Sequence, residues 1–246
     1  MENAMPFALS VFLLFLLFGL VSYLLGSISF AVIFTKCFAH TDVRAHGSGN
    51  AGMTNVMRTA GMAPGLLTLA FDVLKAAVAV VLGYYLLTWL VVQISPDPAG
   101  YAAGLDPVYG ATVCGLCCVI GHIYPIFFGF RGGKGVLVSL GMICVLDWRC
   151  ALILLAVFLL VLLVSRMVSA ASIAAAVAYP IATYLLTAFA SSMPGEGAIT
   201  LLGLPLLWFR TLAAAVFSVI VILRHKDNIV RIAKGEEKRF HIKKAR

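Results

Sequence analysis

Long apolar runs separated by short polar segments dominate the pattern of this chain. A helix rises about 1.5 Å per residue and the hydrocarbon core of a bilayer is roughly 30 Å thick, so about 20 apolar residues can cross it. The pattern predicts an all-α integral membrane protein with seven transmembrane helices, two of them short, in a single domain over residues 1–246. The runs cover residues 5–38, 64–94, 108–128, 136–147, 150–165, 170–190 and 199–223.

Composition excludes a water-soluble globular protein. Of the 246 residues, 62% are hydrophobic and 11% are charged, and the mean hydropathy is +1.05, whereas a soluble domain carries roughly a quarter charged residues. The first run has no basic segment before it and no small-residue cleavage site, so we expect a retained span. The six cysteines lie in or beside apolar runs without histidines at zinc-like spacing, which favours core side chains. No metal and no cofactor are expected.

The positions of the basic residues predict the orientation in the membrane. If residues 39–63 are cytoplasmic, 15 of the 18 Lys and Arg residues fall on that side, nine of them in the tail after residue 223. Cytoplasmic loops are enriched in Lys and Arg. A single helix over 136–165 would place the tail outside, so seven spans, or a re-entrant hairpin at 136–165, fit better. We expect the N-terminus outside and the C-terminus in the cytoplasm.

The first cytoplasmic segment, Asp42 to Arg58, is rich in glycine and small polar side chains. Closely spaced glycines let backbone N–H groups approach an oxyanion, so the segment suits phosphate. Arg58 follows Ser48 by ten residues, close enough in a folded loop to clamp the same group. A flexible loop is the alternative interpretation. The residues concerned are Gly47, Ser48, Gly49, Asn50, Gly52, Thr54 and Asn55.

A second glycine-rich turn, GHIYPIFFGFRGGKG at the end of the third run, brings Arg131 and Lys134 to the same side. It is not a Walker A loop, because Phe128 stands where that motif has glycine and Gly135 where it has Ser or Thr. We interpret the turn as a phosphate cradle without the nucleotide signature, and a basic interfacial anchor is the alternative. His122 is predicted to be a structural histidine near a helix end.

Two further polar groups lie at or within spans. After the last run, His225 and Asn228 are three residues apart, which predicts that they share one face of a continuing helix where it leaves the membrane. The stretch from Lys238 to Arg246 is interpreted as a topology signal and lipid-surface anchor. Asp72 and Lys75 are also three apart, either as a mutually neutralising pair or as the polar floor of a site.

The three cytoplasmic segments all contain cations, and two are glycine-rich. Clustering on one side suits an enzyme that takes a soluble phosphate compound from the cytoplasm and a lipid-like partner from the bilayer. A transporter of organic phosphates would place polar residues and broken helices near the midplane in two matching halves. A scaffold subunit that only binds acidic lipid would not need the cluster. Both classes stay open as alternatives.

At these segments the chain resembles the bacterial acyl-phosphate:glycerol-3-phosphate acyltransferases of the PlsY type, seven-helix inner-membrane enzymes that make lysophosphatidic acid. The similarity covers nearly the whole chain, and three motifs carry it: DVRAHGSGNAGMTNVMRTAG, GHIYPIFFGFRGGKGV and RHKDNIVRIAKGEE. It implies an acyltransferase of phospholipid synthesis in the bacterial inner membrane, with its active site on the cytoplasmic face. The implied partners are glycerol 3-phosphate, acyl phosphate, membrane lipids and an enzyme that produces acyl phosphate, and no nucleic acid.

The resemblance also implies residue roles. The first motif matches positions that bind glycerol 3-phosphate, the second the backbone and the cation that receive the acyl phosphate, and the third polar active-site positions. Glu236 matches a position tied to the integrity of the tail. The residues expected to be catalytic are Ser48, Arg58, Lys134, His225 and Asn228. Those expected to bind substrate are Gly47, Gly49, Asn50, Gly52, Thr54, Arg131, Gly132, Gly133, Gly135 and Ser172.

Four positions depart from the family pattern: Ser29, Met53, Leu137 and Val138 stand where family chains typically have Pro, Ala, Ala and Thr. The last change removes a hydroxyl near the acyl-phosphate loop, so a catalytically weakened family member is a further alternative.

An acyl phosphate is already activated, so no covalent acyl-enzyme is expected, and positioning with charge neutralisation does most of the work. The hydroxyl proton goes to His225 or, as the resemblance favours, to a substrate phosphate.

Overall fold

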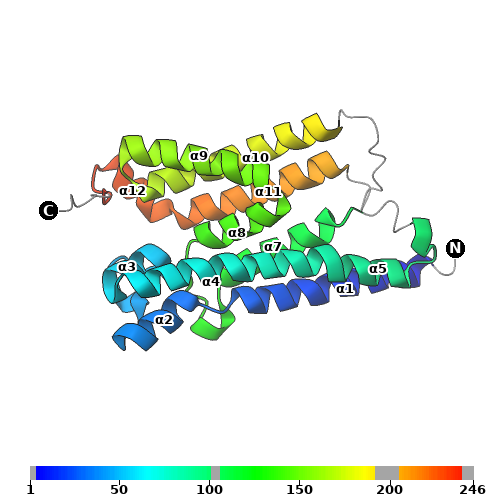
Figure 1. Ribbon diagram of the computed structural model, residues 1–246, viewed down its shortest axis with the longest axis horizontal. Coiled ribbons are helices and arrows are strands. Elements are labelled where there is room, and N and C mark those ends of the chain that lie inside the picture. The colour runs from blue at the N-terminus through cyan, green and yellow to red at the C-terminus, as the bar shows by residue number, and fades with distance from the viewer. Residues whose placement is uncertain (1–3, 101–105, 192–204, 240–246) are drawn as a thin grey trace. The chain divides into compact units, whose positions relative to one another are not determined.

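The structure is a computed structural model that describes residues 4–100, 106–191 and 205–239. Every regular element in these ranges is helical (Figure 1). The helices form two compact units, the first built mainly from Met1–Leu146 and the second from Asp147–Glu196 and Leu204–Arg246. The all-α prediction is confirmed for the described residues, and the expectation of a single domain stays a prediction.

The first unit is a bundle of long apolar helices with short polar connections. Within it α1 runs along α7, and α4 packs against both α7 and α8 (Figure 1). Small residues allow these close approaches: a Cβ at Gly83 would collide with the backbone of Gly110, and one at Gly141 with the backbone of Val73. The elements are α1 (Ala4–Gly26), α2 (Phe30–Ala39), η1 (Val43–Ala45), α3 (Met53–Ala60), α4 (Met62–Val81), η2 (Leu82–Leu87), α5 (Thr88–Ile94), α7 (Val108–Ile123), η3 (Ile126–Phe128) and α8 (Val136–Leu146).

The first apolar run is not one uninterrupted helix, as the pattern alone suggested. It breaks between α1 and α2 at residues 27–29, where Ser29 takes an extended conformation before α2 begins. Ser27 donates its hydroxyl to the Tyr23 carbonyl oxygen at 2.9 Å, which satisfies one group at the end of α1. The run over 64–94 is continuous from α4 through the π-helical η2 to α5.

The second unit is a smaller helical bundle. Its elements are α9 (Trp148–Ser165), α10 (Val168–Ser191), α11 (Leu206–Arg224) and α12 (Lys226–Ala233), and α10 packs against both α9 and α11. Asp147 separates α8 from α9, because its carboxylate accepts the backbone N–H of Arg149 at 3.1 Å and caps the new helix. The prediction that 136–165 is not a single helix is therefore confirmed.

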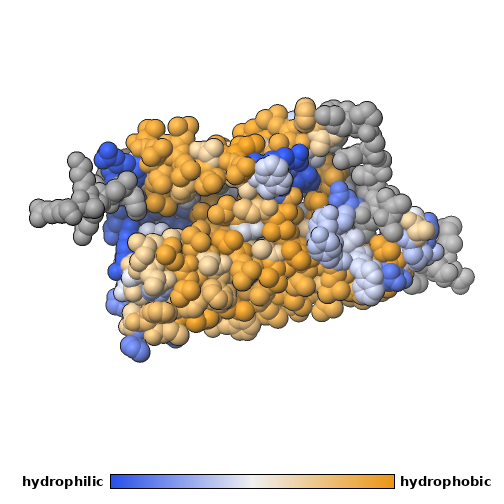
Figure 2. Space-filling view, in the orientation of Figure 1, coloured by the Kyte–Doolittle hydropathy of each residue, from blue (hydrophilic) through white to orange (hydrophobic). Residues whose placement is uncertain are grey.

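Among the described residues, six helical segments are long and apolar enough to cross a membrane, and α8 is a shorter apolar helix. At 11 residues α8 is about 17 Å long, well short of a hydrocarbon core. Seven spans are thus supported only in part. Large apolar side chains such as Leu163 and Val164 are exposed on the outer helix faces, and Figure 2 shows the wide apolar surface that lipid would cover. Residues 199–204 of the last predicted run and residues 240–246 of the basic tail lie outside the described residues.

Candidate active site

Asn55 organises the first glycine loop, the segment between η1 and α3. Its side chain is 2% exposed. Nδ2 donates to the carbonyl oxygens of Val43 and His46, both at 2.9 Å, and of Asn50 at 3.1 Å, while Oδ1 accepts the backbone N–H of Ser48 at 3.0 Å. One amide therefore holds four points of the backbone. These contacts give the loop a defined shape.

Two glycines permit this loop shape. Gly47 and Gly49 have φ angles of 61° and 70°, in the left-handed region where a side chain is unfavourable. A Cβ at Gly47 would also collide with the carbonyl oxygen of the Asn55 side chain. Glycine at position 47 therefore serves the amide contact as well as the turn.

The side chains expected to bind glycerol 3-phosphate surround this loop on the exposed side. Ser48, Thr54 and Arg58 are all exposed. Gly52 stands at the N-cap of α3, and Thr54 and Arg58 lie one turn apart on that helix, so they share a face. One face of α3 therefore presents a hydroxyl group and a guanidinium outside the fold, which suits a phosphate ester.

The second glycine loop is held against the end of α7. The N–H of Gly132 donates to the carbonyl oxygen of Ile123, and that of Gly133 to the carbonyl oxygen of His122, both at 3.2 Å. Gly135 has a φ of 86°, which again favours glycine. The backbone of Gly132 and Gly133 is thus fixed by the helix that precedes it, and their N–H groups are used within the fold.

Gly133 is the point where the two glycine loops meet. A Cβ there would collide with the His122 ring and would lie 2.7 Å from the carbonyl oxygen of Ala51, in the first loop. Only a glycine permits this approach. Lys134 follows, half-buried, and Arg131 is exposed. The first unit therefore brings the two predicted phosphate-binding segments side by side, with cations on both.

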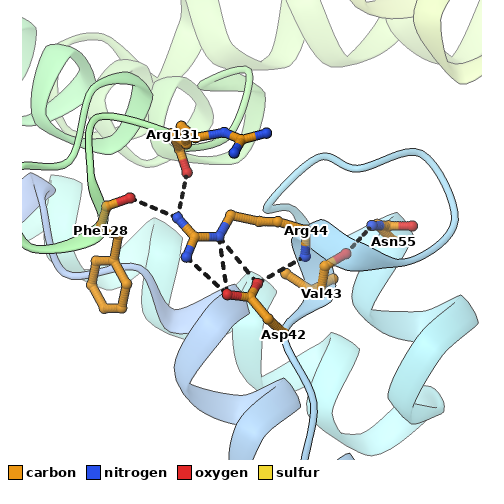
Figure 3. A network of polar contacts seen from close by, with 6 residues as sticks. All are labelled: Asp42, Val43, Arg44, Asn55, Phe128 and Arg131. Atoms are coloured by element: carbon orange, nitrogen blue, oxygen red, sulfur yellow. Dashed lines mark hydrogen bonds and ion pairs between the residues drawn. The ribbon is translucent and has the colours of Figure 1, made fainter.

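Arg44 joins the two loops through its guanidinium group (Figure 3). Nη1 donates to the carbonyl oxygens of Phe128 at 2.6 Å and Arg131 at 3.3 Å, and Nη2 donates to the Asp42 carboxylate at 2.8 Å. The hydrogen bond from Arg44 lowers the pKa of Asp42 below its usual value, so the carboxylate stays charged near neutral pH. We name this set of contacts the Arg44 tether.

Asn55 and Arg44 shape the site, yet neither was among the residues expected to be catalytic or to bind substrate; Asn55 was expected only as one of the small polar side chains of the first loop. Their role depends on carbonyl groups far away in the chain, such as that of Phe128 for Arg44, and no spacing in the sequence reveals such partners. The nearby Asp42 is the one local signal, because an Asp two residues before an Arg can receive its guanidinium.

Two of the positions that depart from the family pattern lie at the start of α8. Val138 is fully buried and Leu137 is half-buried. Valine fills an interior position without the hydrogen-bond partner that a buried threonine hydroxyl requires. Position 138 in this chain therefore belongs to the core beneath the second glycine loop and offers no group to a substrate.

The second unit carries the third motif. His225 is 2% exposed and its Nδ1 lies 2.8 Å from the carbonyl oxygen of Val221; because a carbonyl only accepts, Nδ1 bears the hydrogen and a neutral ring has its lone pair on Nε2. Asn228 is also buried. The predicted continuing helix is wrong, since α11 ends at Arg224 and α12 begins at Lys226 with a turn at His225 between them.

A carboxylate in the tail gathers three donors from two helices. Ser169 Oγ and Asn228 Nδ2 each donate to Oε1 of Glu237 at 2.7 Å, and Arg231 Nε donates to Oε2 at 2.7 Å. These contacts are made by Glu237 and not by Glu236, because the turn after α12 points the side chain of Glu237 inward and leaves Glu236 exposed. The role of Glu236 in the integrity of the tail stays a prediction. Glu237 connects the tail to α10 and to α12.

Ser172 is the remaining expected site residue of this unit. It is buried in α10, and its hydroxyl donates to the carbonyl oxygen of Val168 at 2.9 Å, one turn earlier in the same helix. This is the usual local bond of a serine within a helix. Substrate binding by Ser172 stays a prediction.

Comparison with known proteins gives consistent matches over nearly the full length. A family model described as glycerol-3-phosphate acyltransferase matches residues 16–235. The glycerol-3-phosphate acyltransferase of Idiomarina loihiensis is 36% identical over 228 residues, which cover 92% of this chain and 95% of that protein. That of Pectobacterium carotovorum is 35% identical over 228 residues, covering 90% and 87%.

Solved structures match as well. The crystal structure of PlsY, an integral membrane glycerol 3-phosphate acyltransferase, in its glycerol 3-phosphate form has a TM-score of 0.67 and 33% sequence identity, covering 92% of this chain and 96% of that one. Its lysophosphatidic acid form has a TM-score of 0.65 and 31% identity, covering 92% and 95%.

Proposed function

This chain belongs to the glycerol-3-phosphate acyltransferase family, and on that premise we propose that it moves a fatty acyl group from an acyl phosphate to the 1-hydroxyl of sn-glycerol 3-phosphate. The products are lysophosphatidic acid and inorganic phosphate. The observation that carries the proposal is the Arg44 tether, because it joins the loop with Ser48 to the loop with Lys134. Two phosphate-suited loops held together fit a reaction between two phosphate compounds.

Charge neutralisation is the first task of such a site. Each substrate carries about two negative charges near neutral pH, as expected for phosphate monoesters, so the substrates repel each other. Arg58, Lys134 and Arg131 are the cations proposed to offset this repulsion, with the exposed hydroxyl groups of Ser48 and Thr54 as additional donors. Binding both substrates next to each other then supplies most of the rate acceleration through proximity.

The acyl transfer itself needs no covalent enzyme intermediate. The 1-hydroxyl oxygen of glycerol 3-phosphate attacks the carbonyl carbon of the acyl phosphate, the new C–O ester bond forms, and the bond from that carbon to the phosphate oxygen breaks. Phosphate departs with the electron pair. The hydroxyl proton goes to a substrate phosphate oxygen, with Nε2 of His225 as the other acceptor. The substrate-assisted route is the one we propose.

Membrane placement completes the proposal. The polar loops lie on the cytoplasmic side of the bacterial inner membrane, where glycerol 3-phosphate is soluble, and the acyl chain reaches the site from the lipid. The excess of Lys and Arg in the segments assigned to the cytoplasm supports this orientation. An enzyme that produces acyl phosphate is the proposed supplier of the donor.

Phosphate release tests the reaction. The purified protein in detergent or lipid mesophase is given palmitoyl phosphate with and without glycerol 3-phosphate, and lysophosphatidic acid is identified as the product. We expect release that depends on both substrates and disappears in Lys134→Ala. Lys36→Ala, an exposed cation on α2, is the matched control and should stay active.

A parallel assay with palmitoyl coenzyme A tests the donor. Turnover with the thioester and none with acyl phosphate would overturn the proposed donor while leaving the acyltransferase family intact. A folded protein that makes no lysophosphatidic acid with either donor would favour the catalytically weakened family member. Uptake of glycerol 3-phosphate into sealed vesicles without a donor would favour a transporter.

A further inference from the structure

A cluster of charged and polar side chains lies buried among the helices of the first unit. Asp72 and Lys75 on α4 are 1% and 3% exposed, and His122, near the end of α7, is 6% exposed. Asp72 Oδ1 lies 2.8 Å from Lys75 Nζ, so the two charges neutralise each other. Paired charges inside a membrane bundle are tolerated but costly, and an apolar pair would often do as well for stability. Their presence points to a function.

Lys75 makes two further contacts besides Asp72. Its Nζ donates to the carbonyl oxygen of Ile28, in the break between α1 and α2, at 2.8 Å, and lies 3.1 Å from Nδ1 of His122. An ammonium group has three N–H donors and no acceptor. Nδ1 of His122 therefore accepts, and the hydrogen of the neutral ring is on Nε2.

The alternative partner of Nδ1 is excluded by distance. Asp72 Oδ1 lies 3.6 Å from Nδ1 of His122, which is longer than a hydrogen bond. Lys75 is thus the group that orients the His122 ring. Because Lys75 is only 3% exposed, it is not placed to contact a substrate.

The Nε2 edge of the oriented His122 ring faces the second glycine loop. A Cβ at Gly133 would collide with Nε2, and on its other side would meet the carbonyl oxygen of Ala51 in the first loop. The backbone N–H of Gly133 also donates to the carbonyl oxygen of His122 at 3.2 Å. His122 therefore holds this loop through its backbone and through its ring, at the point where the two loops meet.

We propose that Asp72, Lys75 and His122 form a positioning relay for the acyl-phosphate loop. Lys75 orients the ring of His122, and the Nε2 edge of that ring sets the position of Gly133 against Ala51 and hence of the loop that carries Lys134, the cation proposed to receive the phosphate. Lys75 and His122 are positioning residues. The proposal rests on the proposed function, because it concerns the loop assigned there to acyl phosphate.

An apolar replacement of the ion pair separates positioning from structural support. The double variant Asp72→Leu/Lys75→Met leaves no buried charge without a partner, so we expect it to fold with a thermal midpoint close to that of the wild type. Because a small misplacement of a binding group has large effects, its KM for acyl phosphate should rise about tenfold or more, while its KM for glycerol 3-phosphate is unchanged. A folded double variant with the wild-type KM for acyl phosphate would overturn the relay.

A double-mutant cycle tests whether Lys75 acts through His122. The variant His122→Asn keeps an acceptor near Nδ1 but lacks the Nε2 edge, so it should show the same rise in KM. Adding it to the apolar pair should cause no further loss, because coupled residues are not additive; additive losses would overturn the relay. If the apolar pair does not fold, Lys75→Arg takes its place in the cycle, because it keeps the charge but changes the donor geometry.

The controls separate this inference from the proposed function. Thr68→Val on α4 removes a buried hydroxyl whose partner, the Pro64 carbonyl oxygen at 2.8 Å, is local, and it should leave both KM values unchanged. A wild type with no turnover of acyl phosphate means that the proposed function fails. A wild type that turns over, beside relay variants with unchanged KM, means that only the relay fails.

Discussion

Asn55 accepts the backbone N–H of Ser48 at 3.0 Å through its side-chain oxygen, while its side-chain nitrogen donates to three carbonyls of the same loop. Replacement by leucine leaves these buried backbone groups without partners, at a cost of about 1–3 kcal/mol for each unsatisfied group. We expect Asn55→Leu to lower the thermal midpoint and to raise the KM for glycerol 3-phosphate more than the KM for acyl phosphate.

Two further variants sharpen this prediction. Asn55→Asp keeps the acceptor for Ser48 but loses both donors and places a carboxylate beside carbonyl oxygens, so it should be at least as damaging as leucine. Thr59→Val, on the same helix, should have little effect. Equal changes in the two KM values for Asn55→Leu would show that the residue supports the unit in general rather than this loop.

The Arg44 tether predicts a defect that is larger in catalysis than in stability. Arg44 and Asp42 are partly exposed, and such ion pairs contribute only about 0–1 kcal/mol to folding. Lysine in place of Arg44 can meet the carboxylate but cannot also donate to the carbonyl of Phe128, since it lacks the fork. We expect Arg44→Lys to lose about tenfold or more in kcat/KM for both substrates with a small change in thermal midpoint.

A variant of Asp42, the acidic partner in the Arg44 tether, is compared with Arg44→Lys. Asp42→Asn keeps a group that can accept from Arg44 and should retain most of the activity that Arg44→Lys loses. Steady-state kinetics and thermal unfolding are measured on the same preparations. A wild-type kcat/KM in Arg44→Lys would show that the loops keep their relative position without the guanidinium.

Glu237 predicts a pH-dependent stability of the tail. Burial raises the pKa of Glu237, but hydrogen bonds from Ser169, Arg231 and Asn228 outweigh burial and hold it below its ordinary value. A carboxylate with a lowered pKa stabilises the fold above its unfolded-state pKa, about 4.3, and this contribution is lost as the pH falls through the folded-state value. Glu237→Gln should therefore lower the thermal midpoint at neutral pH, with a difference from the wild type that shrinks below about pH 4.3.

Glu236→Gln is the matched control for this prediction. The residue is adjacent and exposed, so the same loss of charge should leave the midpoint and the activity almost unchanged. Because Glu237 also holds Asn228, Glu237→Gln should reduce activity as well. The reverse order of effects in the two variants would contradict the assignment of the carboxylate contacts.

His225→Ala distinguishes the two proton routes. With a substrate phosphate as acceptor, the variant keeps a few per cent or more of the activity and the pH profile of kcat does not change; loss of about 10⁴-fold, the upper end for one acid–base residue, would make His225 the base. His225→Gln tests the local contact to Val221, because the ring at that position donates to this carbonyl. Both variants are compared under conditions that saturate both substrates.

The proposed orientation is tested by cysteine labelling in intact cells. In a background without the six native cysteines, Asp97→Cys should react with a membrane-impermeant maleimide, and Lys238→Cys should react only after the membrane is opened. The excess of Lys and Arg after α11 gives this expectation. Labelling of Lys238→Cys in intact cells would reverse the topology.

Most of the fold follows from local pattern. Apolar runs long enough to cross a bilayer must form helices, because backbone groups in lipid find partners only within the segment. The pattern also predicted the interruption between α8 and α9, since the basic tail required an additional crossing. The pattern did not reveal the break at Ser27–Ser29, because no proline or glycine cluster marks the end of α1. At this break the Lys75 ammonium donates to the carbonyl oxygen of Ile28.

The sequence by itself determined that this chain is an all-helical membrane protein of the glycerol-3-phosphate acyltransferase family, and it predicted phosphate chemistry in the glycine-rich segments, because hydropathy, periodicity and motif spacing can be read along the chain. Only the tertiary structure decided what those segments touch. The contacts of Arg44 with Phe128, of Lys75 with His122 and of Ser169 with Glu237 join residues between 47 and 84 positions apart. Such hydrogen bonds depend on how helices pack, and packing distance has no counterpart in the order of residues along the chain.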